Sequence, residues 1–324
     1  MLKNTLSRLH ELPSFVSLLI RFGEIVPQPS EIDRIREDVS SVLDALISLG
    51  ARLTRPLESL SITRLPPVHF PQYDHPAIGS LRAHLSFFEI HISSTDSWSS
   101  PVTPPPPREG LMSSCERFYY HTLQRRLLPA PSAATGLENL ESLSLCFSDP
   151  IGVLFFTYSF AELHFPRLRA LRLQHAQFSD ERDAETFVAQ HGDTLLELHL
   201  LHCQIMLTMD TDMETEAIAF DDNDGTAGSA DWPAVSWPWS DIYVEFANKL
   251  KRLVYLEVND AWWASPPEKY VRYTGGDLVQ FWQRGRTEDI RSLENFKQTV
   301  MDRAEKLGIE YEREYFPSFS QPGC

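Results

Sequence analysis

The chain has 324 residues, 42% of them hydrophobic, so it is long enough for one large domain or two small ones. Its net charge of −16, without a dense Lys/Arg run, argues against nucleic acids and anionic membranes as main partners. The longest strongly apolar runs, 15–20 and 151–156, are far shorter than the roughly 18 residues of a membrane helix, and no signal peptide is evident. Four cysteines without paired spacing favour reduced thiols and a cytoplasmic or nuclear protein.

Short strands are predicted wherever spaced leucines lead into a pair of apolar residues that are separated by one residue. In chain order these segments are 12–20, 57–65, 85–90, 137–145, 165–178, 195–205 and 250–258. From the second segment onward, the apolar pairs begin at positions 60, 88, 143, 171, 198 and 256, so the intervals are 28, 55, 28, 27 and 58. The period is therefore about 28 residues, with two enlarged or degenerate units, and it lies in the range of leucine-rich repeats.

Helices are predicted between the strands and after the last one. Apolar residues follow helical spacing over 32–46, and Gly50 stops that helix. Ser179 can cap a second helix, which Gly192 can end. A third helix over 288–307 would cap the terminal unit, which would otherwise expose its core. Its apolar side is predicted to hold Ile290, Leu293, Phe296, Val300, Ala304 and Leu307.

The alternation of strand and helix at this period predicts an α/β leucine-rich-repeat solenoid. One unit cannot bury the apolar side of its strand alone, so neighbouring units stack, with parallel strands on the concave face and helices on the convex face. The solenoid is expected to span 1–265, with insertions near 93–135 and 207–241. Residues 266–324 are expected to form the C-terminal capping helix and a tail.

The stretch "DTLLELHLLHCQI" (193–205) resembles the irregular leucine-rich repeats of fungal F-box-like proteins. The matching positions are His191, Thr194, Leu195, Leu198, Leu200, Cys203 and Ile205. This resemblance covers about 50–265 and implies a substrate-recognition subunit of a cullin–RING ubiquitin ligase, held by a Skp-type adaptor. The F-box itself is not evident, because Leu12-Pro13 is not followed by an acidic residue. We therefore expect the adaptor-binding module to be absent, remote or truncated.

Two His-containing clusters could in principle bind a metal. His199, His202 and Cys203 lie within five residues, but strand alternation separates His199 from Cys203, and zinc needs about four converging ligands. Cys203 is predicted to fill a small buried position. His69, Asp74 and His75 are assigned to a proline-containing surface loop. No cofactor or metal is predicted, and no catalytic motif occurs, so the chain is not expected to be an enzyme.

Both insertions leave alternatives open. Residues 99–110 are proline-rich and form either a stiff loop or a polyproline ligand for an aromatic-lined module. Residues 209–231 are predicted to be a mobile acidic loop, since the "DDNDG" motif lacks the terminal glutamate of a calcium loop. Trp232, Trp237 and Trp239 either pack against the repeats or anchor a partner.

The function predicted from these patterns is recognition of a protein partner on the concave face, with no nucleic acid and no membrane involved. The alternatives are a free-standing scaffold unrelated to ubiquitin and, more remotely, a hydrolase with a site assembled across the fold. The residues expected to bind are those that alternate with the apolar pairs. They are Glu89, His91, Arg172, Gln174, Glu197, His199, Tyr255 and Glu257.

Overall fold

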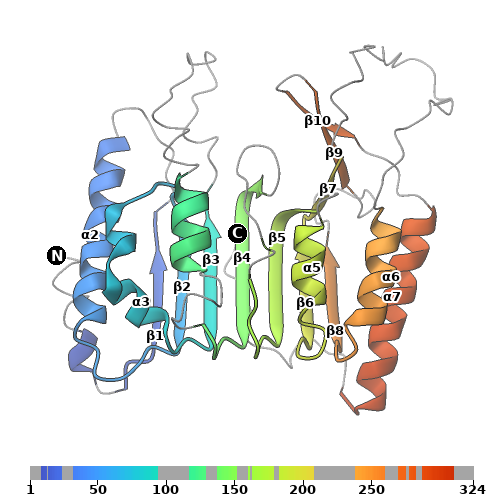
Figure 1. Ribbon diagram of the computed structural model, residues 1–324, viewed down its shortest axis with the longest axis horizontal. Coiled ribbons are helices and arrows are strands. Elements are labelled where there is room, and N and C mark those ends of the chain that lie inside the picture. Colours follow the sequence, from blue (N-terminus) through green and yellow to red (C-terminus); the bar gives the residue numbers. More distant parts are fainter. Residues whose placement is uncertain are drawn as a thin grey trace.

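The protein is an α/β fold built on a seven-stranded parallel sheet, with its helices on one side (Figure 1). The computed structural model describes residues 9–12, 14–23, 32–93, 117–128, 137–151, 160, 163–178, 182–207, 238–259, 269–274, 277–281 and 287–309. The strands, in the order in which they pair, are β1 (Ser17–Arg21), β2 (Ser59–Leu65), β3 (Phe87–Ile92), β4 (Ser142–Ile151), β5 (Ala170–Phe178), β6 (Glu197–Leu201) and β8 (Tyr255–Asn259).

The register of the strands confirms the apolar pairs predicted from the sequence. One row of paired residues runs across the sheet through Leu18, Leu60, Phe88, Leu143, Leu171, Leu198 and Leu256. A second row, two residues further along each strand, runs through Ile20, Ile62, Ile90, Leu145, Leu173, Leu200 and Val258. All of these side chains except the half-buried Val258 belong to the buried core. Because side chains alternate along a strand, both rows face the helices.

The same backbone hydrogen bonds recur where each strand begins. Two residues before the first apolar row, one carbonyl accepts from two successive N–H groups of the next strand. Arg169, for example, accepts from Leu196 N and Glu197 N at 2.7 and 2.9 Å. The accepting carbonyls belong to Val16, Glu58, Ser86, Glu141, Arg169 and Leu196, so all six junctions between neighbouring strands share this geometry.

Three chain segments share the same unusual backbone conformation. Arg64, His175 and His202 each lie four residues after the first apolar row, and each has a positive φ, of 58°, 56° and 51°. Non-glycine residues adopt this left-handed conformation uncommonly. The conformation thus recurs at one position relative to the apolar rows.

The helices cover the apolar side of the sheet (Figure 1). They are α2 (Ile32–Gly50), α3 (Pro76–Arg82), the π-helix η4 (Phe118–Leu127), α5 (Asp183–Ala189), α6 (Trp239–Lys249) and α7 (Thr287–Lys306), together with the short 3₁₀ turns η1 (Leu9–Glu11) and η2 (Pro71–Asp74). The predicted stop at Gly50 is confirmed. A side chain there would place a Cβ 2.5 Å from the Ala77 carbonyl oxygen, so glycine is needed where α2 meets α3.

Each of the two long sequence intervals advances the sheet by one strand. β3 pairs directly with β4, and β6 pairs directly with β8, so no further strand of the parallel sheet lies between the members of either pair. Helix η4 lies in the first interval and α6 lies in the second. The proline-rich segment 99–110, the acidic segment 209–231, Trp232, Trp237 and Ser179 lie outside the described residues. Trp239 is buried in α6, where its ring stacks on Tyr243 at 5.3 Å, so its role in the described structure is packing.

The C-terminal part contains the predicted helix and one feature that was not predicted. In α7, Leu293, Phe296, Val300 and Ala304 are buried, whereas Ile290 and Leu307 are exposed, so the predicted apolar side is correct only in its middle. The unpredicted feature is the antiparallel hairpin of β9 (Lys269–Thr274) and β10 (Asp277–Phe281). It extends a parallel ladder from the end of β5 through β7 (Gln204–Leu207).

Leu200 tests whether the second apolar row carries stability. It is 1% exposed on β6, between β5 and β8, so we expect Leu200→Ala to lower the free energy of unfolding by about 2–5 kcal/mol. Leu19 on β1 is 66% exposed, and Leu19→Ala should change stability by less than about 0.5 kcal/mol. Equilibrium denaturation of both variants measures this. Equal losses of unfolding free energy in the two variants would show that the assignment of inward-facing and outward-facing strand residues is wrong.

Candidate functional site

The eight residues predicted to bind lie together on the side of the sheet that faces away from the helices, which we call the sheet face. Strand register arranges this face in three columns. The first contains Ser142, Ala170, Glu197 and Tyr255; the second contains Ser61, Glu89, Ser144, Arg172, His199 and Glu257; the third contains His91, Cys146, Gln174 and Leu201. Arg172 and His199 are direct neighbours in the second column, as the sequence predicts.

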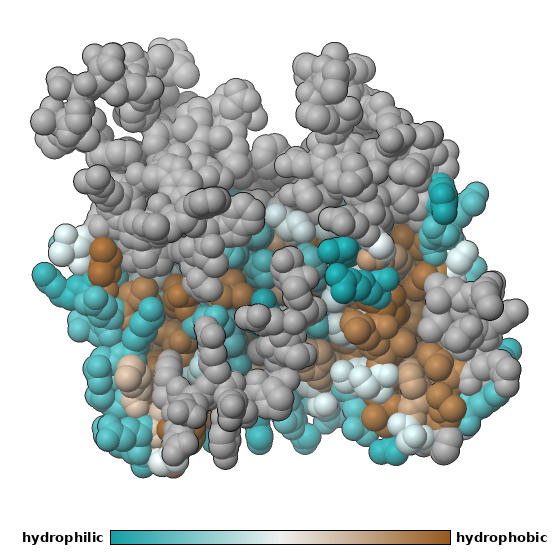
Figure 2. All heavy atoms as spheres, turned by 180° about the vertical axis from the view of Figure 1, so that it is seen from behind, coloured by the Kyte–Doolittle hydropathy of each residue, from teal (hydrophilic) through white to brown (hydrophobic). Residues whose placement is uncertain are grey.

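The sheet face is less exposed than the sequence suggests. Glu197, His199 and Gln174 are buried, with 2%, 6% and 9% of their surface exposed. Glu89, His91, Arg172, Tyr255 and Glu257 are half-buried. Hydrophilic and hydrophobic residues lie side by side on this side of the molecule (Figure 2). The face is therefore a mixed surface in which polar side chains pack against one another.

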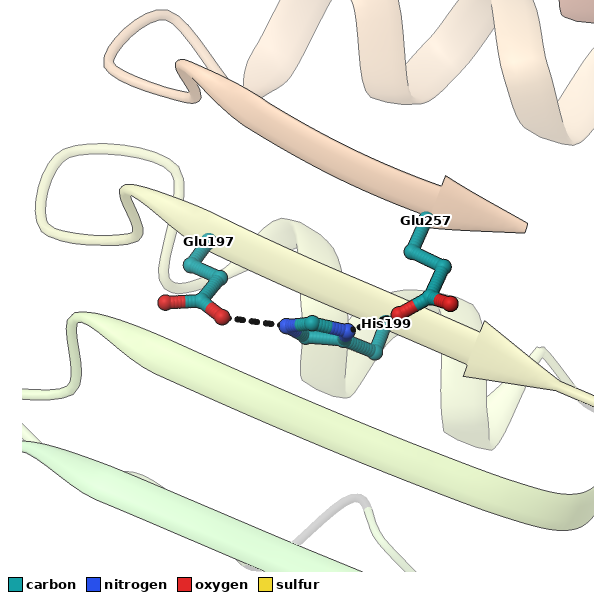
Figure 3. A network of polar contacts seen from close by, with 3 residues as sticks. All are labelled: Glu197, His199 and Glu257. Carbon is teal, nitrogen blue, oxygen red and sulfur yellow. Dashed lines mark hydrogen bonds and ion pairs between the residues drawn. The ribbon is translucent and has the colours of Figure 1, made fainter. Parts of the chain in front are cut away.

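Three of the predicted residues form one polar network, with His199 held between two carboxylates (Figure 3). The Nε2 atom of His199 contacts Glu197 Oε1 on the same strand, and its Nδ1 atom lies 2.7 Å from Glu257 Oε2 on β8. Carboxylates accept hydrogen bonds, so this arrangement favours the protonated ring, in which both nitrogens donate. The ring of Tyr255 lies 5.2 Å from that of His199 and covers it from the neighbouring strand.

The network determines the protonation of His199. Burial disfavours the charged ring and lowers the pKa, but the hydrogen bonds to Glu197 and Glu257, together with their charges, outweigh that effect. The pKa of His199 is consequently raised above 6.5.

The other predicted residues have local partners of their own. Glu89 accepts a hydrogen bond from the hydroxyl of Ser61, its neighbour in the second column. His91 Nε2 lies 3.2 Å from Ser148 Oγ, and burial, with smaller contributions from Arg64, His175 and other cations, lowers the pKa of His91 to about 4. His91 is therefore neutral at pH 7.

The structure gives both suspected metal clusters structural roles. Cys203 is buried, as predicted, and its thiol donates to the Leu173 carbonyl at 3.5 Å. His69 Nδ1 lies 2.8 Å from Thr122 Oγ1, and Asp74 pairs with Arg126 at 2.6 Å. His75 caps α3 by accepting from Ala77 N at 3.2 Å. Within the described ranges, no group of His, Cys, Asp or Glu side chains is arranged to hold a metal ion.

His191 is a structural residue that the sequence marked only as part of a motif. Its Nδ1 donates to the Phe187 carbonyl at 2.7 Å, and its Nε2 accepts from Phe165 N at 3.0 Å. One neutral ring thereby joins α5 to the turn that precedes β5. Burial lowers the pKa of His191 to about 4, which keeps the ring in this bridging form.

Comparison of the chain with protein-family models, with curated proteins and with solved structures found no match. Among the described residues, no helix combines the length and the apolar character needed to cross a bilayer.

The pH dependence of stability tests the His199 network. The folded protein holds this proton more tightly than the unfolded chain, so the stability that it contributes is complete below pH 6.5 and is lost as the pH rises through the raised pKa. Removing one member of a buried ionic network costs about 3–5 kcal/mol. We therefore expect His199→Ala to lower the free energy of unfolding by about 3 kcal/mol at pH 6, and by less as the pH rises to 9.

Chemical denaturation across this pH range provides the measurement. His84 is exposed, so His84→Ala serves as the control and should be nearly neutral throughout. A loss for His199→Ala that is the same at pH 6 and pH 9, or that grows with pH, would contradict the assignment of the imidazolium.

Proposed function

We propose that this protein is a recognition module of the leucine-rich-repeat type that binds a protein partner on its sheet face. The observation that carries the proposal is the common register of seven parallel strands, which gathers eight residues of mixed character on one face. The recurring carbonyl geometry at strand starts and the left-handed residues four positions after the first apolar row support a repeat architecture. In such solenoids each unit contacts its neighbours, and the strands form an extended binding surface.

The chemistry of the face favours a protein over a nucleic acid. Arg172 and Tyr255 belong to the residue types that are enriched in protein–protein contacts, and both are half-buried rather than free in solvent. The charged predicted residues combine Arg172 and His199 with three glutamates, and the whole chain has a net charge of −16. A phosphate backbone would instead require a dominant basic surface.

The more specific proposal is substrate recognition for a cullin–RING ubiquitin ligase. It rests on the resemblance of 191–205 to the repeats of fungal F-box-like proteins. The alternative is a free-standing scaffold that binds the same kind of partner without an adaptor.

Co-purification from cells tests the binding face. We expect Arg172→Glu with Tyr255→Ala to reduce partner capture at least tenfold, because it reverses one central charge and removes one aromatic contact. The matched control is Arg291→Glu with Met301→Ala on α7, where both residues are exposed. The control should capture partners as the unchanged protein does. Circular dichroism verifies that both variants are folded.

Loss of capture in the α7 variant with full capture in the sheet-face variant would contradict the proposed face. The same purified material separates the two roles. A Skp-type adaptor that co-purifies in stoichiometric amount supports the ubiquitin-ligase role. Partners recovered repeatedly without an adaptor support the scaffold role.

A further inference from the structure

The strand β1 forms one end of the parallel sheet and has a neighbour on one edge only (Figure 1). In the part of the chain that the structure describes, no strand pairs with its other edge. At the opposite end of the sheet, α7 packs against the last strand, β8. Leu19, at the centre of β1, is 66% exposed, whereas Ser61, which pairs with it on β2, is 8% exposed. The outer edge of β1 is therefore accessible to a partner.

The hydrogen bonds between β1 and β2 determine which backbone groups of β1 face outward. The Val16 carbonyl accepts from two N–H groups where β2 begins, at 2.8 and 3.1 Å, and Phe22 N donates to a carbonyl of β2 at 3.0 Å. Successive residues of a strand direct their N–H and C=O groups to opposite edges, so the even-numbered residues of β1 face β2. The backbone groups of Ser17, Leu19 and Arg21 consequently point to the outer edge.

The outer edge of β1 lacks the features that keep sheet edges from pairing. Proteins usually protect such edges with lysine, proline or a β-bulge, because the free N–H and C=O groups are a template for another strand. Residues 17–21 contain no lysine and no proline, and their register with β2 has no shift. The one charged side chain, Arg21, lies at the last position, and Leu19 lies at the centre. These features indicate an edge that another strand covers.

The sequence of β1 is complementary to a second, antiparallel copy of itself. With a two-fold axis at Leu19, the two Leu19 residues lie opposite each other, and Ser17 of each copy lies opposite Arg21 of the other. Each of these pairs can exchange both of its hydrogen bonds, because all three residues direct their backbone groups outward. On the apolar side, Leu18 of one copy falls opposite Ile20 of the other, so both apolar rows continue across the junction. No like charges oppose each other, since arginine meets serine.

We propose that two copies of this chain associate through the outer edges of β1, antiparallel and with the two-fold axis at Leu19. The contact joins the two parallel sheets into one and places the two sheet faces side by side. It does not depend on the proposed function, although it would offer two linked sites to a partner with a repeated motif. The contact involves one short edge, so we expect a dissociation constant on the order of 10 μM. Unfolding measurements on Leu19→Ala below that concentration report on the monomer.

Sedimentation velocity of the full-length chain over a concentration series tests the proposal. We expect the unchanged protein to pass from monomer to dimer as its concentration rises. Leu19→Glu and Leu19→Lys each place like charges opposite one another, so each should weaken association by about tenfold or more. An equimolar mixture of these two variants should restore the dimer, because opposite charges then meet. The matched control is Val244→Glu on α6, where Val244 is 52% exposed, and it should dimerise as the unchanged protein does.

A chain that stays monomeric throughout the series overturns the proposal and leaves the edge to a strand of a different protein. Species that grow beyond the dimer also overturn it, because a two-fold contact closes at two copies. The same holds if dimers survive in folded Leu19→Glu and Leu19→Lys, or if the mixture of the two stays monomeric.

Amide hydrogen exchange of the unchanged protein decides the matter even if the variants fail to fold. The amides of Ser17, Leu19 and Arg21 should exchange more slowly at concentrations at which the dimer forms than at concentrations at which the chain is monomeric. The Leu18 and Ile20 amides, which face β2, should show no such dependence and serve as the internal control. Exchange at the three outward amides that is independent of concentration would contradict the pairing of the edges.

Discussion

The structure depends on one constraint, which is that no strand of the sheet can bury its apolar pair without its neighbours. At each junction a single carbonyl accepts from two N–H groups of the next strand, and this contact fixes the register before any side chain is considered. With the register fixed, Leu171, Leu198 and Leu256 meet in one buried row. Backbone geometry and apolar burial thus specify the same alignment, which is the consistency expected of a unique fold.

The same register determines the chemistry of the opposite face. Residues that alternate with the apolar rows must lie in columns, so His199 is brought between Glu197 on its own strand and Glu257 from β8, 58 residues later in the chain. The imidazolium is stable there because the two carboxylates compensate for the loss of water. The network therefore joins β6 to β8 on the sheet face through the His199 ring.

The sequence predicted the regular part of the structure because the periodicity of leucines reports directly on burial. The pairs at Leu60, Leu143 and Leu198, the stop at Gly50 and the burial of Cys203 are all confirmed. The candidate residues were placed on one face for the same reason. Alternation along a strand fixes the direction of each side chain, even when its partners are unknown.

Features that depend on partners distant in the sequence could not be predicted. The burial of Glu197 and His199 arises from packing across strands, and the spacing of residues does not report it. Glu185 lies in the first turn of α5, yet it is 1% exposed, and burial raises its pKa to about 7. The segment that forms the hairpin of β9 and β10 has no regularly spaced leucines, so the periodicity of the sequence did not predict it.

Amide hydrogen exchange at residue resolution tests the central claim, that all units share one register set by the carbonyl contacts. The amides that donate at the strand starts include those of Glu141, Arg169, Leu196 and Val254. The register predicts that these amides exchange slowly, as a set, with rates close to those of the strand interiors. Fast exchange at these positions, with protection confined to the middle of each strand, would contradict the common register and the binding face derived from it.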